Sequence, residues 1–122
     1  MEKPRFNFED LEVWKKGIVF AKEAIILAGN LSSESKHFRL IDQIEAAATS
    51  VPSNIAEGAG RFSRKEFINF LYIARGSLYE VLTLLTICRQ DSWIKNLDFE
   101  KMRAMAAEIN RMISGLIASL KP

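Results

Sequence analysis

Apolar side chains recur every three or four residues along almost the whole chain, and no stretch of useful length alternates as a half-buried strand would. Glycine and proline are few, and they fall where such helices would begin, end or bend. The pattern predicts helices over 8–28, 34–58, 63–89 and 98–120. Short connections between long helices favour antiparallel neighbours. We therefore predict an all-α, up-down-up-down four-helix bundle that forms a single domain over residues 1–122.

The first predicted helix has an unusually wide apolar surface. Asn7 is its candidate N-cap, because an asparagine side chain can bond a free backbone N–H at a helix start. The expected core face comprises Leu11, Trp14, Ile18, Ala21, Ile25 and Ala28. A second stripe repeats every seven residues about a third of a turn away, at Val13, Phe20 and Leu27. Two stripes make more apolar surface than one neighbouring helix can cover.

The second predicted helix contains Pro52. Its expected core face comprises Leu40, Ile41, Ile44, Ala48, Val51 and Ile55. Because proline lacks an N–H and crowds the preceding turn, we predict a kink there and a freed carbonyl at Ala48. The hydroxyls of Thr49, Ser50 and Ser53 are candidate partners for the freed groups.

The third predicted helix opens with Ser63 followed by Glu66, the spacing of a capping box. Its expected core face comprises Phe67, Phe70, Leu71, Ala74, Leu78, Val81, Leu82 and Leu85. Apolar residues also lie on both flanks, at Ile68, Tyr72, Tyr79, Ile73, Leu84 and Ile87. A helix that is apolar nearly all round is either central or covered by another subunit. The fourth helix has Asp98 as its candidate cap and a stripe at Met102, Met105, Ile109, Met112, Leu116 and Leu120.

Composition limits the class of protein. The chain of 122 residues is 48% hydrophobic and 26% charged, as globular soluble proteins are. Charges interrupt the apolar runs before the roughly 18 residues of a membrane span, and the N-terminus lacks the pattern of a signal peptide. We therefore expect a cytoplasmic protein. The single cysteine, Cys88, allows no disulfide framework and no Cys/His metal site.

The net charge of +2 permits contact with nucleic acid without arguing for it. Arg61, Arg64 and Lys65 form the one dense basic cluster, at the positive end of the third helix, where cations are mildly unfavourable. One interpretation is a phosphate held by these charges and by free backbone N–H groups. The alternative is that Glu57, Glu66 and solvent neutralise the cluster. A ring of subunits would repeat it into a basic rim.

A polar series follows one narrow arc of the second helix and comprises Gln43, Ser50, Asn54, Glu57 and Arg61. The series is either the solvated side of an amphipathic helix or part of a polar network. In the second interpretation, Asn54 and Glu57 meet Ser77 and Glu80 of the third helix. Such a network would fix the register of the helices more than it would add stability.

No catalytic set stands out. His37 is alone, paired Glu-x-x-His motifs are absent, and no Walker loop is present, so we predict no enzyme, metal or cofactor. Tyr72, Tyr79 and Trp93 are suited to stack on bases, although aromatic residues in such patterns usually belong to a core or an interface. A minor hypothesis is an enzyme that acts at a subunit interface through Glu57 or Glu80.

Three runs of sequence resemble one known family: FEDLEVWKKG at 8–17, QIEAAATSVPSNIAEGAGR at 43–61 and SRKEFINFLYIARGSLYEVLTLL at 63–85. This is the S23 family of four-helix bundles, encoded by intervening sequences in bacterial 23S ribosomal RNA genes. The accessory variability proteins of diversity-generating retroelements are similar in outline. The matched positions are Gln43, Ser50, Asn54, Glu57, Gly58, Ala74, Ser77 and Glu80, and none reads as catalytic.

The resemblance implies a homopentamer arranged as a barrel with a central channel. For the retroelement branch it also implies binding to a reverse transcriptase and to nucleic acid. This chain departs from that branch in its modest net charge, since those proteins are expected to be more basic. Our preferred hypothesis is an oligomeric interaction module that docks RNA, DNA or a nucleic-acid enzyme. The alternative is a structural or protein-binding bundle without affinity for nucleic acid.

Overall fold

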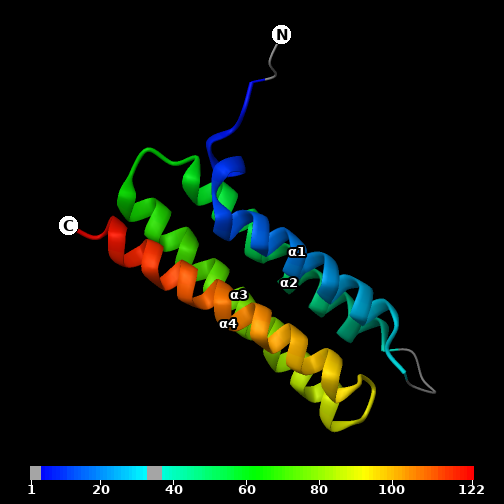
Figure 1. Cartoon of the computed structure of the whole chain (residues 1–122). Helices are drawn as coiled ribbons and strands as arrows, with labels where there is room; N and C mark the ends of the chain where they lie inside the picture. The colour runs from blue at the N-terminus through cyan, green and yellow to red at the C-terminus, as the bar shows by residue number, and fades with distance from the viewer. Residues whose placement is uncertain (1–3, 33–36) are drawn as a thin grey trace.

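The computed structural model describes residues 4–32 and 37–122, which form four long helices packed side by side (Figure 1). The elements in order are η1 (Asn7–Asp10), α1 (Glu12–Gly29), α2 (Phe38–Ala59), α3 (Arg64–Gln90) and α4 (Asn96–Leu120). Both α1 and α3 pack against α2 and α4. The prediction of an all-α four-helix bundle with antiparallel neighbours is therefore confirmed.

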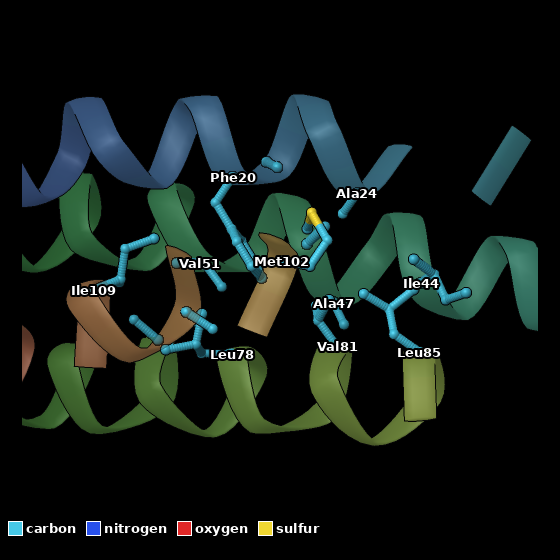
Figure 2. Close-up of a cluster of buried hydrophobic side chains, with 14 of the residues drawn as sticks. Phe20, Ala24, Ile44, Ala47, Val51, Leu78, Val81, Leu85, Met102 and Ile109 are labelled. Carbon is cyan, nitrogen blue, oxygen red and sulfur yellow. The ribbon is translucent and has the colours of Figure 1, made fainter. Parts of the chain in front are cut away.

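All four helices contribute apolar side chains to one shared interior (Figure 2). The labelled members are Phe20, Ala24, Ile44, Ala47, Val51, Leu78, Val81, Leu85, Met102 and Ile109. The predicted core faces of α2 and α3 agree well with this interior, because most of their central residues are buried. Burial of these side chains is the main driving force for association of the helices.

The core face of α1 differs from the prediction. The buried residues are Val13, Gly17, Phe20, Ala21, Ala24 and Ala28, whereas Trp14, Ile18 and Ile25 are only half-buried. A Cβ added at Gly17 would lie 3.4 Å from the Cβ of Pro52, an ordinary van der Waals distance, so α1 and α2 are in packing contact at this glycine. The buried face of α1 therefore combines small residues with Val13 and Phe20, and Trp14, Ile18 and Ile25 lie at its edge.

The prediction that Asn7 caps α1 is wrong. Residues Asn7–Asp10 form a separate turn, and α1 begins at Glu12 with no side-chain cap at Leu11. The side-chain amide of Asn7 instead donates to the backbone carbonyl of Ala59, at 2.6 Å. A hydrogen bond to the end of α2 has replaced the local cap.

The helix α2 continues through Pro52, which is buried against α1. The hydroxyl of Thr49 donates to the carbonyls of Glu45 and Ala46, so it does not bond to the Ala48 carbonyl that the proline leaves free. The kink at Pro52 stays a prediction. The predicted start at Glu34 lies outside the described residues.

The predicted start of α3 is confirmed, because the Ser63 hydroxyl accepts a bond from the backbone N–H of Glu66 at 3.2 Å. The predicted cap of α4 is wrong, because this helix begins at Asn96 with Lys95 as its N-cap and Asp98 inside the first turn. Its buried residues are Phe99, Met102, Ala106, Ile109, Ile113 and Ile117. Met105 and Met112 of the predicted stripe are therefore only half-buried, and Ile113 and Ile117 of the adjacent row are buried instead.

Among the described residues, α3 is the one helix long and apolar enough to cross a membrane by length and composition alone. Its central part carries Arg75 and Glu80, and one face is buried between α2 and α4. The apolar character of α3 is therefore explained in part by its place in the bundle.

Candidate functional site

A small polar cluster lies between α2 and α3, made of Ser50, Asn54 and Ser77. The hydroxyl oxygens of Ser50 and Ser77 are 2.8 Å apart. The Asn54 amide donates to the hydroxyl and to the carbonyl oxygen of Ser50, both at 2.8 Å. Ser77 is buried, so its hydroxyl depends on Ser50 for a partner. The cluster joins one point of α2 to one point of α3.

The other residues predicted for this network lie outside the cluster. Glu57 is exposed and binds Arg61, four residues along the same helix, at 3.0 Å. Gln43 and Glu80 are exposed, and neither side chain has a hydrogen bond or ion pair with another described residue. The structure thus brings together three of the six predicted residues.

The predicted basic cluster is divided between two surfaces. The Arg61 guanidinium binds Glu57 and lies 4.9 Å from the centre of the Phe70 ring. Arg61, Glu57 and Glu66 line a groove of about 480 Å³ beside the turn η1, together with the exposed aromatic ring of Phe62. The charge of Arg61 is therefore already partly neutralised within the chain.

Arg64 and Lys65 face a different groove, where the start of α3 meets the end of α4. This groove has a volume of about 450 Å³, and its other lining residues are Ile68, Asn69, Leu120 and Pro122. Neither cation forms an ion pair with another described residue. Arg64 and Lys65 are therefore the two members of the cluster whose charge is open to a ligand.

Large apolar side chains remain exposed on the outward sides of α1 and α3. On α1 these are Val19, at 51% exposed, and Ile26, at 57%. On α3 they are Ile73, at 51%, and Ile87, at 45%. Part of the excess apolar surface that the sequence predicts therefore remains exposed in a single folded copy.

Few groups in the described residues are placed for catalysis. Burial, with a smaller effect of Asp91, raises the pKa of the Cys88 thiol, so the thiol stays protonated in the core at neutral pH. No three His, Cys, Asp or Glu side chains of residues 4–32 and 37–122 lie close enough to hold a metal ion. Glu57 and Glu66 line one groove, and both side chains are exposed.

Two contacts at these surfaces had no signal in the sequence. Phe70 lies nine residues after Arg61 and across a turn, so helical spacing does not connect them. Leu120 reaches the groove of Arg64 only because the last turn of α4 returns to the first turn of α3. Contacts of this kind depend on tertiary packing.

Comparisons with known proteins place the chain beside one group. Residues 9–115 match the family described as 23S rRNA-intervening sequence protein. A crystal structure of a protein with unknown function from the S23 ribosomal protein family of Bacteroides thetaiotaomicron is 30% identical, with a TM-score of 0.80. The match covers 86% of this chain and 97% of that chain. No curated protein matches the sequence. The outline similarity to retroelement accessory proteins stays a prediction.

Proposed function

The chain belongs to the 23S rRNA-intervening sequence protein family, and we propose that it acts as a self-associating, non-enzymatic module that docks nucleic acid or a nucleic-acid enzyme. The observation that carries this proposal is the apolar surface left uncovered on α1 and α3. Contiguous exposed apolar patches mark interaction sites, and we infer that these side chains belong to such patches. The family resemblance suggests five copies in a ring.

The two apolar surfaces lie on opposite sides of the bundle. Because α1 and α3 each pack on α2 and α4, they are diagonal, and their outward faces point away from each other. We call Val19, Lys22 and Ile26 the α1 patch, and Ile73, Glu80 and Ile87 the α3 patch. Two different patches on opposite sides suit head-to-tail contact, which closes into a ring when the rotation permits.

The charges within the two patches are complementary. Lys22 lies between the apolar residues of the α1 patch, and Glu80 lies between those of the α3 patch. Neither charge forms an ion pair with another described residue. If the α1 patch of one copy covers the α3 patch of the next, both apolar pairs are buried and the two charges face each other.

Light scattering at micromolar concentration tests self-association. We expect a mass five times the 13.8 kDa of one chain. Ile73→Glu combined with Ile87→Glu should give monomers, because association would bury two unpaired carboxylates. The matched control is Leu97→Glu, which changes an 80% exposed leucine outside both patches and should leave the mass unchanged. A monomeric wild-type protein would refute this half of the proposal.

A charge exchange tests the head-to-tail contact itself. Lys22→Glu and Glu80→Lys should each weaken assembly, because each places like charges opposite one another. The combined variant should assemble again, since the pair is restored with its signs reversed. If the combined variant is weaker than both single variants, the two patches do not face each other.

The docking half of the proposal is supported by the open charges of Arg64 and Lys65, which assembly would repeat in each copy. The same samples, mixed with labelled RNA or DNA over a salt series, test it. Arg61→Glu combined with Arg64→Glu should weaken binding. No binding at low salt would favour the alternative, a structural or protein-binding bundle. The Glu57–Arg61 ion pair supports this alternative, because it already neutralises one cation of the basic cluster.

A further inference from the structure

The seam between α3 and α4 carries aromatic and cationic side chains in alternation. Along α3 the face repeats at helical spacing through Lys65, Ile68, Tyr72, Arg75 and Tyr79. Tyr72 is 41% exposed and Tyr79 is 50% exposed, so neither ring is a core residue. From α4, Arg103 joins Tyr79 around a small groove of about 140 Å³.

The tyrosine rings are held in place although they are exposed. The Tyr79 hydroxyl donates to the side-chain oxygen of Asn110 on α4, at 3.1 Å. The Arg75 guanidinium lies 5.0 Å from the centre of the Tyr72 ring and donates to the Ser114 hydroxyl, at 3.2 Å. A ring with a fixed orientation loses less conformational entropy when it binds a ligand.

The seam has cations but its neighbouring carboxylates are directed elsewhere. Glu108 binds Lys16 of α1 at 2.8 Å, and Glu100 binds Arg89 at the far end of α3. Glu66 and Asp98 line grooves on other sides of the bundle. Glu80 follows Tyr79 but lies about 100° around the helix. The charged side chains along this face of α3 and around its groove with α4 are therefore cationic, and Arg75 and Arg103 form no ion pair with any described residue.

We propose that this seam binds single-stranded RNA, with bases stacked on Tyr72 and Tyr79 and phosphates held by Arg75, Arg103 and Lys65. Aromatic side chains interleaved with cations are the arrangement that single strands require, because only unpaired bases offer a free face. The Asn110 amide lies beside the Tyr79 hydroxyl and the Ser114 hydroxyl lies beside Arg75, and both groups provide partners for a ribose 2′-hydroxyl.

This inference deepens the docking half of the proposed function, on which it rests, and places the site on a surface that a single copy already has. It does not depend on the α1 and α3 patches. The two tyrosines are two helical turns apart, about 10 Å along the axis, so the seam contacts a few nucleotides. Binding should therefore survive in the monomeric Ile73→Glu, Ile87→Glu variant with lower avidity.

Fluorescence anisotropy with a labelled 12-nucleotide RNA tests the stacking. Tyr79→Ala should weaken binding roughly tenfold, because stacking of one base is worth about 1–3 kcal/mol. Tyr79→Phe keeps the ring but removes the hydrogen bond to Asn110, so it should weaken binding less than Tyr79→Ala does. The same RNA as a duplex, and DNA of the same sequence, should bind more weakly. Circular dichroism confirms that each variant remains helical.

A salt series tests the phosphate contacts. Arg75→Gln combined with Arg103→Gln should reduce the salt slope by about 0.7 for each phosphate that the variant no longer neutralises. Arg39→Gln, an exposed arginine at the start of α2, is the matched control and should leave the slope unchanged. Equal binding of duplex RNA or of DNA would overturn the assignment to single-stranded RNA.

The two proposed binding surfaces can fail separately. If Arg61→Glu with Arg64→Glu abolishes binding while Tyr72→Ala and Tyr79→Ala leave it unchanged, the seam is refuted and the docking function stands. If no RNA binds at low salt, the seam is refuted. If DNA does not bind either, docking of nucleic acid is refuted as well, and light scattering still decides self-association.

Discussion

Two glycines lie where α2 packs against its neighbours, and one of them has no room for a Cβ. Gly17 of α1 lies against Pro52, and Gly58 of α2 lies against Phe70 of α3. A Cβ at Gly58 would be 2.7 Å from the Cβ of Phe70, a distance at which something must shift. Because Phe70 also lies under Arg61, this close approach supports the end of the bundle where two of the grooves open.

We predict that Gly58→Ala destabilises the fold by about 1–3 kcal/mol, as overpacking does in other cores. Its matched control is Gly115→Ala on α4, where an added Cβ meets no atom within 4 Å. That control should stabilise the protein by up to about 1 kcal/mol, since alanine favours a helix more than glycine does. Urea denaturation measures both. Equal effects of the two substitutions would contradict the close approach at Gly58.

At the scale of elements, the polar cluster fixes how α2 and α3 lie against each other. A shift of one helix along the other by a single turn would separate Ser50 from Ser77 and leave a buried hydroxyl without a partner. The cluster therefore favours the register that the structure shows.

A double-mutant cycle tests this role. Ser50→Ala should cost about 1–3 kcal/mol, because it leaves the Ser77 hydroxyl unpaired in the interior. Adding Ser77→Ala should cost little more, or recover stability, because the orphaned hydroxyl is removed. Ser53→Ala, on the exposed side of α2, is the control and should be nearly neutral. Strictly additive effects of the first two substitutions would show that the pair is not coupled.

At the scale of the whole molecule, α1 closes the bundle by meeting α4. Two ion pairs span this junction, Lys16 to Glu108 at 2.8 Å and Lys101 to Glu23 at 3.7 Å. The hydrogen bond between Lys16 and Glu108 lowers the pKa of Glu108 and raises the pKa of Lys16. Both side chains are partly exposed, so salt should screen the interaction.

The lowered pKa of Glu108 sets the direction of a pH effect. A carboxylate with a depressed folded pKa stabilises the fold above its unfolded pKa, and this contribution is lost as pH falls through the folded value. NMR titration should show that Lys16→Met raises the pKa of Glu108 toward its ordinary value. Lys15→Met, which removes a pair within α1, should leave that pKa unchanged. A Glu108 pKa that is the same in wild type and Lys16→Met would contradict the link.

Local signals predicted the features that act within one helix. The Ser63 cap, the four helical segments and the core face of α3 all follow from spacing along the chain. The choice between two adjacent stripes on α1 did not, because either stripe satisfies helical periodicity. The structure buries members of both stripes, Val13 and Phe20 of one and Ala21 and Ala28 of the other.

The candidate sites divide in the same way. Sequence alone grouped Arg61, Arg64 and Lys65, because they are neighbours along the chain. The structure separates them, since Arg61 turns toward Phe70 and the other two turn toward the end of α4. It also joins Tyr79 of α3 to Arg103 of α4, which no helical spacing connects.

From its residues alone, this protein is recognisable as a bundle of four helices with more apolar surface than one core can hide. Periodicity and capping are properties of a single segment, so they can be read without knowing which segment lies beside it. Which stripe is buried, which polar residues meet and where the open charges gather became known only when the helices were packed together. Those features arise when side chains from different helices come within a few ångströms, and their positions along the chain do not encode that distance.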